Sequence, residues 1–153
     1  MENLFQPVLR GKTVIVGIGN PLRGDDGFGP ALIERLCGKV SATCIDAGNT
    51  PENYVGRIVK EAPDTILLVD VAHLGLEPGQ YRLLEPDDIV RSGLTTHDMS
   101  SHMLIAFLQD QTQATIVMLA VQPQQVLLGE SMSACVTATL YTIEKQLQEA
   151  AHA

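Results

Sequence analysis

The sequence predicts an α/β fold in which one domain has three α/β/α layers around a mainly parallel, twisted sheet of about five strands. Three short, uninterrupted apolar runs, at Thr13–Ile18, Thr65–Val69 and Thr115–Val121, are rich in Val, Ile and Leu and indicate strands buried on both faces. Amphipathic helical patterns lie between and after these runs. Alternating strands and helices produce parallel neighbours joined by right-handed crossovers, with helices on both faces of the sheet.

Two further segments complete the predicted sheet. Thr43–Asp46 and Gln80–Leu84 are short and apolar, and the second is entered through the turn Pro78-Gly79 and followed by polar residues. In an open sheet of this kind, ligands bind in the crevice beyond the carboxyl ends of the strands. The residues that follow each strand are therefore the first place to look for function.

Each of the four predicted helices has an apolar face. Phe28, Leu32 and Leu36 are spaced by four residues and share the inward face of the first helix. Thr50 is suited to cap the second helix, with Pro51 in its first turn. We expect the third helix to begin near Asp98 and the last to be capped by Ser131 or Ser133. The inward-facing residues of these three helices are expected to be Tyr54, Val55, Ile58 and Val59, then Met99, Met103, Leu104, Phe107 and Leu108, and finally Val136, Leu140, Ile143 and Leu147.

Length and composition exclude several classes of protein. A chain of 153 residues is one ordinary domain, expected over residues 1–153 with a core at about 13–147, and needs no disulfide or structural metal to build that core. The net charge of -8 disfavours nucleic-acid binding. The three cysteines form no C-x-x-C pair, so we expect buried thiols in a reducing compartment. Neither a signal peptide nor a membrane span is recognisable, which predicts a soluble, cytoplasmic protein.

The loop after the first strand combines glycines with acids. Gly17 and Gly19 could begin a dinucleotide-binding motif, but Leu22 stands where its third glycine is needed. Asp25 and Asp26 follow, and at 4 Å each carboxylate would repel a phosphate by about 1 kcal/mol even in water. A cation fits this loop better than a phosphate. The simpler alternative is that Asp25 or Asp26 caps the next helix.

Two more residues are candidates for the same crevice. Asp70 comes directly after the apolar run at 65–69, and that strand is expected to neighbour the first, which would bring Asp70 close to Asp26. His97 lies in the loop before the third helix. Two carboxylates and one imidazole suit a divalent ion such as nickel or zinc, with coordination positions left open. Those positions would hold either a water molecule for hydrolysis or ligands from a partner.

Weaker candidates surround this trio. His73 lies three residues after Asp70 and is either an additional ligand or an exposed loop residue. Asp46, at the end of the second strand, is a ribose acceptor in the dinucleotide hypothesis, a wall of a substrate cleft, or a turn residue. We assign no function to His102 or His152. No serine lies in the G-x-S-x-G motif that is typical of a covalent nucleophile.

The chain resembles a known family. The pattern Gly17-x-Gly19-Asn20-x-Leu22-x-x-Asp25-Asp26-Gly27-x-Gly29 is similar to the opening motif of the nickel-iron hydrogenase maturation endopeptidases. The resemblance covers nearly all of residues 13–147, and Glu77-Pro78-Gly79 with the paired threonines before His97 is most similar to the branch that serves formate-linked, hydrogen-evolving hydrogenases. Further segments in family order are Asp46-Ala47-Gly48, Pro51-Glu52, Asp70, Gly75, Thr96-His97-Asp98, Gln122-Pro123, Gly129 and Met132-Ser133.

This resemblance implies a cytoplasmic, usually monomeric endopeptidase, aspartic-type by family classification, that removes a C-terminal extension from the hydrogenase large-subunit precursor after nickel insertion. It implies that Asp26, Asp70 and His97 are the catalytic residues and contact nickel held by the precursor's cysteines, so that the enzyme needs no metal cofactor of its own. One position departs from the family pattern, because His73 stands where a second acid is common. Asp70 remains the expected ligand.

Two other functions are compatible with the same residues. A nickel chaperone or scaffold would use the trio to bind the metal without cutting a peptide, and a dinucleotide-binding domain would use Gly17, Gly19 and Asp46. For the protease, either metal polarisation of the carbonyl or a metal-activated water, with an aspartate as general base, fits the residues.

Overall fold

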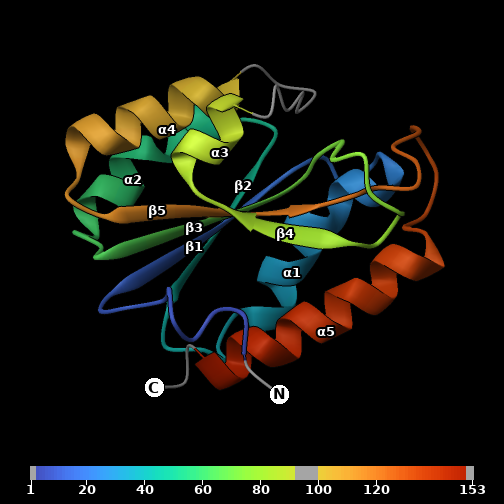
Figure 1. Cartoon of the computed structure of the whole chain (residues 1–153), viewed down its shortest axis with the longest axis horizontal. Helices are drawn as coiled ribbons and strands as arrows, with labels where there is room; N and C mark the ends of the chain where they lie inside the picture. Colours follow the sequence, from blue (N-terminus) through green and yellow to red (C-terminus); the bar gives the residue numbers. More distant parts are fainter. Residues whose placement is uncertain (1–2, 92–99, 151–153) are drawn as a thin grey trace.

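The computed structural model describes residues 3–91 and 100–150 and confirms the predicted α/β fold. One five-stranded sheet has the order β2-β1-β3-β5-β4 (Figure 1). Its first four strands in that order are parallel, and β4 pairs antiparallel with β5 at one edge. The strands are β1 (Thr13–Ile18), β2 (Thr43–Gly48), β3 (Thr65–Val71), β4 (Tyr81–Leu84) and β5 (Thr115–Val121).

Helices cover both faces of this sheet. In Figure 1, α1 and α5 lie on one side, and α2, α3 and α4 lie on the other. Two short 3₁₀ turns, η1 and η2, precede α1 and α2. The bounds are η1 (Gly24–Gly27), α1 (Phe28–Leu36), η2 (Pro51–Tyr54), α2 (Val55–Lys60), α3 (Pro86–Arg91), α4 (Ser100–Gln111) and α5 (Ala134–Ala150). No helix in these described stretches is both long and apolar enough to cross a membrane.

The two cores follow from the alternation of side chains along the strands. Leu67 and Val69 of β3 face α1 and α5, whereas Ile66 and Leu68 of the same strand face α2 and α4. Every residue of β3 is buried, as the apolar run predicted. Each fully buried Leu or Ile contributes about 1.5–3 kcal/mol to folding, so both faces of the central strand hold the sheet and its helices together.

The order of the strands creates a crevice. From β1 the chain passes through α1 on one face to β2, and from β2 it passes through α2 on the other face to β3. The connections therefore diverge at β1 and β3, which are adjacent and parallel. In open α/β sheets such a switch point is where ligands bind, beyond the carboxyl ends of the strands. We call this end of the sheet the carboxyl edge and the opposite end the amino edge.

The inward face of α4 differs from the prediction. Met103 and Phe107 are 63% and 50% exposed, although we expected them in the core, while Leu104, Ile105 and Leu108 are buried. The three buried residues form one narrow stripe, and Met103 and Phe107 lie on the part of the helix turned away from it. Met99 and the predicted helix start at Asp98 lie outside the described residues.

Other local features also differ from the sequence analysis. The Thr50 side chain makes no capping hydrogen bond, because the chain enters a 3₁₀ turn at this point before α2 begins. The Ser133 hydroxyl, predicted to cap α5, donates instead to Asp25. The polar residues that follow β4, from Pro86 on, form the short helix α3, which the sequence analysis did not predict.

The cysteines are less buried than expected. Cys37 is exposed, and Cys44 and Cys135 are half-buried. All three are free thiols in this structure. Burial, with a smaller effect of the neighbouring Cys37, raises the pKa of Cys44 to about 11. Cys44 is therefore protonated, and a weak nucleophile, at neutral pH.

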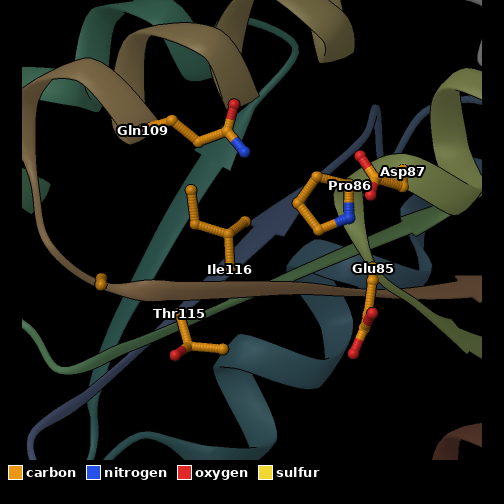
Figure 2. A pocket seen from close by; sticks show the side chains of 7 residues that line it. Glu85, Pro86, Asp87, Gln109, Thr115 and Ile116 are labelled. Carbon is orange, nitrogen blue, oxygen red and sulfur yellow. The ribbon is translucent and has the colours of Figure 1, made fainter.

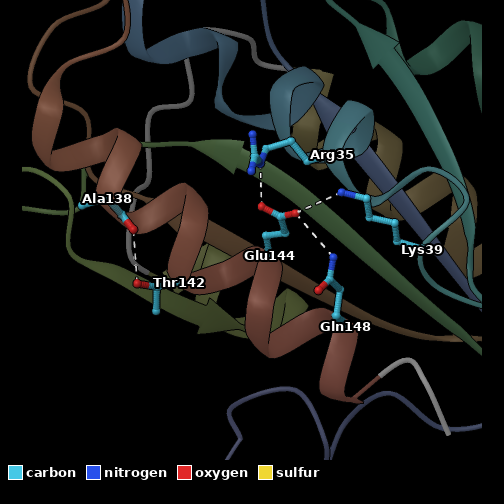
Figure 3. A network of polar contacts seen from close by, with 6 residues as sticks. All are labelled: Arg35, Lys39, Ala138, Thr142, Glu144 and Gln148. Carbon is cyan, nitrogen blue, oxygen red and sulfur yellow. Dashed lines mark hydrogen bonds and ion pairs between the residues drawn. The ribbon is translucent and has the colours of Figure 1, made fainter.

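An ion pair joins the two helices on one face of the sheet. Glu144 of α5 accepts a hydrogen bond from Nε of Arg35 in α1 at 2.5 Å. The second carboxylate oxygen lies 3.8 Å from Nζ of Lys39 and accepts a bond from Gln148 (Figure 3). The Arg35 guanidinium also lies over the ring of Tyr141 at 4.7 Å. Glu144 is thus the central contact between α1 and α5 outside the apolar core.

We predict that Glu144→Ala lowers the melting temperature by about 2–4 °C, because it removes a largely buried carboxylate from its partners in a domain of this size. Lys145→Ala, at the exposed neighbouring position, is the control and should change the melting temperature by less than about 1 °C. Circular dichroism melts of both variants test this, and equal melting temperatures for the Glu144 variant and the unmodified protein would show that the ion pair adds nothing.

Candidate active site

Two glycines bring the first turn of α1 directly onto the sheet. A Cβ atom at Gly29 would lie 2.4 Å from the carbonyl oxygen of Ile18 and 2.9 Å from that of Val69. A Cβ at Gly17 would lie 2.4 Å from the carbonyl oxygen of Gly29. No side chain fits in either place. The glycines of the sequence motif therefore allow a backbone-to-backbone contact at the ends of β1 and β3.

Asp26 is fixed beside the end of β1 by this contact. Its carboxylate is buried, and Oδ2 accepts a hydrogen bond from the backbone N–H of Asn20 at 2.8 Å. Gly19, the residue after β1, has φ of +141°, and a Cβ there would lie 1.9 Å from the carbonyl oxygen of Asp26. The 3₁₀ turn η1 that carries Asp26 also contacts β3. The acid is held by main chain on several sides.

Asp70 lies at the carboxyl edge on the neighbouring strand. β3 extends to Val71, so Asp70 is the last residue but one of the strand that follows from the apolar run. It is buried, and Oδ1 accepts a hydrogen bond from the backbone N–H of Val71 at 2.8 Å. The residue before it, Val69, is paired with Gly17 of β1. Asp26 and Asp70 therefore lie at the same edge of adjacent strands, as the sequence predicted.

His97 lies outside the described residues, so the structure does not place it relative to the two acids. The helix that follows it in the chain, α4, begins at Ser100. β5 comes after α4 and starts beside the start of β3, at the amino edge. Because α4 spans about 18 Å along its axis and ends near this start, its first residue lies toward the carboxyl edge.

Asp25 is a buried acid whose role the sequence analysis did not identify. Its Oδ2 accepts hydrogen bonds from the backbone N–H groups of Gln124 and Gln125 at 2.8 and 3.1 Å. Oδ1 accepts from the N–H of Ser133 at 2.7 Å, and the Ser133 hydroxyl donates to both oxygens. Asp25 thus fastens the loop between β5 and α5 to η1. The segments Gln122-Pro123 and Met132-Ser133, which match the family pattern, could have indicated these partners. Their spacing in the sequence alone does not show that they contact Asp25.

The weaker candidates lie at the surface. His73 is exposed. Asp46 is also exposed, and its Oδ1 accepts a hydrogen bond from the N–H of Gly48, as expected for a turn residue. Among the side chains that the structure describes, at residues 3–89 and 103–150, no three from His, Cys, Asp or Glu are grouped so that they could hold a metal ion.

A pocket of ≈ 230 Å³ lies at the opposite end of the sheet (Figure 2). Its lining includes Glu85, Pro86 and Asp87 after β4, Gln109 near the end of α4, and Ile116 at the start of β5. These positions are at the amino edge, away from Asp26 and Asp70. Because ligands of such sheets bind at the carboxyl edge, the candidate active site is the pair of acids.

Comparison with known proteins identifies the family of this chain. A model of the hydrogenase maturation protease family matches residues 30–150. This chain belongs to the hydrogenase maturation protease family. The matched region includes Asp70 and His97 and begins just after the glycine motif that positions Asp26.

Several hydrogenase maturation proteases are similar to this chain over most of its length. Hydrogenase 3 maturation protease from Escherichia coli K12 is 33% identical over 138 residues, which cover 88% of each protein. The crystal structure of the maturation protease HycI from Thermococcus kodakarensis KOD1 has a TM-score of 0.88 at 30% identity and covers 96% of this chain and 97% of that one. HybD from E. coli, at 16% identity and a TM-score of 0.76, shares the fold.

The glycine contact in this protease leads to a stability prediction. Gly29→Ala should lower the free energy of unfolding by about 2 kcal/mol or more, because the new methyl group meets three backbone atoms that cannot move without separating α1 from the sheet. Urea unfolding followed by circular dichroism measures the loss.

Gly56→Ala is the matched control. Gly56 lies in α2, is exposed and has no atom within 4 Å of an added Cβ. Alanine there should stabilise the protein by up to about 1 kcal/mol. Equal stability of the Gly29 variant and the unmodified protein would mean that α1 can move away from β1 at little cost.

Proposed function

We propose that this hydrogenase maturation protease is an endopeptidase that removes the C-terminal extension of a nickel-iron hydrogenase large-subunit precursor once nickel has been inserted. The observation that carries the proposal is the pair of buried acids at the carboxyl edge, Asp26 in the turn η1 that follows β1 and Asp70 near the end of the adjacent parallel strand β3. Family membership supports the proteolytic activity. The precursor, the site of cleavage and the dependence on nickel belong to the proposal.

The proposed ligands suit a nickel ion that arrives with the substrate. Asp26 and Asp70 supply carboxylate oxygens and His97 supplies an imidazole nitrogen, a set suited to a borderline divalent metal. Three such ligands leave coordination positions open, and we expect the cysteines of the precursor to occupy them. The metal is then cargo of the substrate, and the protease has no metal cofactor of its own.

Recognition and chemistry are linked in this arrangement. A precursor that carries nickel can bind to all three side chains at once, and this contact brings the peptide bond to the carboxyl edge. A nickel ion there polarises a carbonyl or lowers the pKa of a bound water to about 7. One of the two aspartates acts as general base for hydrolysis through the carboxylate oxygen that does not bind the metal. Processing would therefore follow insertion of the metal and never precede it.

The position of the two acids favours this function over dinucleotide binding. A dinucleotide phosphate at the start of α1 would meet the carboxylate of Asp26 instead of free N–H groups, and a phosphate there is repelled. Asp46, the expected ribose acceptor, bonds its own turn. We further propose that the protein acts as a monomer in the cytoplasm, on another protein and not on nucleic acid or a membrane.

The first test is cleavage of the cognate large-subunit precursor, nickel-loaded and nickel-free in parallel, read as a change in the mass of its C-terminus. We predict shortening of the loaded precursor alone. Shortening of both forms would remove nickel from the recognition step. If neither is shortened and the isolated protein binds nickel tightly with one-to-one stoichiometry, the function is that of a chaperone or scaffold.

The second test concerns the three side chains. Asp26→Asn, Asp70→Asn and His97→Ala should each lower the rate of cleavage by at least about a hundredfold, because each removes a metal contact or a base. Asp46→Asn is the control, since Asp46 is an exposed acid at the end of a neighbouring strand, and should cleave like the unmodified protein. Far-ultraviolet circular dichroism establishes that every variant is folded. Undiminished cleavage by any of the three variants would take that residue out of the mechanism.

A further inference from the structure

Three exposed leucines lie on two loops at the carboxyl edge. Leu22, Leu127 and Leu128 are 66%, 61% and 69% exposed. Leu22 belongs to the loop after β1, and the other two to the loop after β5. Large apolar side chains are normally exposed singly and without consequence. Here, however, three of them occur on loops that border the same site.

Hydrogen bonds hold the two loops together. The N–H of Gly129 donates to the carbonyl oxygen of Leu22 at 2.8 Å, and the N–H of Gly24 donates to that of Glu130 at 3.1 Å. The first of these bonds places Gly129, the residue that follows Leu128, in contact with the backbone of Leu22. Below them, the buried carboxylate of Asp25 accepts the bonds from Gln124, Gln125 and Ser133 described above. The three leucines, which we call the leucine rim, therefore belong to one fastened surface.

The leucine rim is connected to the acid pair by a short series of hydrogen bonds. The N–H of Leu22 donates to Oδ1 of Asn20 at 2.9 Å. The N–H of Asn20 in turn donates to Oδ2 of Asp26 at 2.8 Å. A polypeptide whose scissile bond lies at Asp26 thus has the rim beside it on the enzyme surface.

The charge of the two loops indicates what kind of segment fits. Within residues 20–24 and 124–133 there is one basic side chain, Arg23, and one acidic side chain, Glu130, although the chain as a whole carries a net charge of -8. A surface without net charge on an acidic protein does not attract anionic membranes or nucleic acid. It suits an apolar stretch of another protein.

We propose that the leucine rim is the docking surface for an apolar segment of the hydrogenase precursor next to the bond that is cut. The proposal rests on the proposed function and adds a substrate contact away from the metal ligands. Asp25 supports this arrangement, because it accepts hydrogen bonds from Gln124, Gln125 and Ser133 at the two ends of the loop that carries Leu127 and Leu128. Pre-fastened loops reduce the entropy lost when the precursor binds.

The test is the double substitution Leu127→Ser, Leu128→Ser, with cleavage of the nickel-loaded precursor measured over a range of precursor concentrations. Both side chains are exposed, so their replacement leaves the core intact. KM should rise by about tenfold or more, as expected for apolar contacts at the centre of an interface, and kcat should stay within about twofold. Loss of kcat with an unchanged KM would overturn the docking role.

Tyr141→Ser is the matched control. Tyr141 is also an exposed, large apolar side chain, but it packs on Arg35 near the end of α1, toward the amino edge. Its KM and kcat should equal those of the unmodified protein. A rise in KM of the same size in this variant would show that any loss of apolar surface has the effect, and would overturn the assignment to the rim.

Two further results separate this inference from the proposed function. If the unmodified protein cleaves the precursor and the leucine variant has the same KM, the docking surface is wrong and the function stands. If the unmodified protein does not cleave the precursor, both fail. Analytical ultracentrifugation tests whether the rim binds a second copy of this chain instead. If the unmodified protein is a dimer, the leucine variant is a monomer and KM is unchanged, the rim is a dimer interface and the proposal is overturned.

Discussion

The contact between the first turn of α1 and the ends of β1 and β3 is the constraint on which the candidate site depends. It exists because Gly17 and Gly29 have no side chains, so that main chain meets main chain where a methyl group would already collide. Asp26 precedes this turn by only a few residues, and its position follows from the contact. A carboxylate placed by backbone geometry has little freedom to move when a ligand binds, which favours a defined coordination geometry.

Asp25 and Asp26 are neighbours in the chain with different partners. Asp26 accepts a hydrogen bond from the N–H of Asn20 in its own loop, while Asp25 accepts hydrogen bonds from N–H groups about 100 residues further along the chain. Their different directions follow from the 3₁₀ turn, in which consecutive side chains point about 120° apart. One acid can therefore face the crevice while the other secures the loop beside it. The turn η1 therefore carries both a candidate catalytic carboxylate, Asp26, and the carboxylate that holds the neighbouring loop, Asp25.

Much of the fold was predictable from the sequence because β1, β3 and β5 are apolar runs buried on both faces, a pattern with few alternatives. The meeting of Asp26 and Asp70 at one edge was predictable for the same reason, since adjacent parallel strands end together. Met103 and Phe107 were misplaced because four-residue spacing identifies a stripe but not which side of it the sheet covers. The role of Asp25 was missed because most of its partners are backbone N–H groups, which nearly every residue type provides. His97 stays a prediction.

The bonds of Asp25 also bear on the order in which the protein can become active. They join positions 99 to 108 residues apart in the chain, so the loop after β5 can take its place only when nearly the whole domain has folded. A nascent or partly unfolded chain can form β1 and its acidic turn, but it has no completed surface next to them. For an enzyme that cuts other proteins, assembly of the substrate surface from both halves of the chain is a safeguard: incomplete molecules are poor proteases.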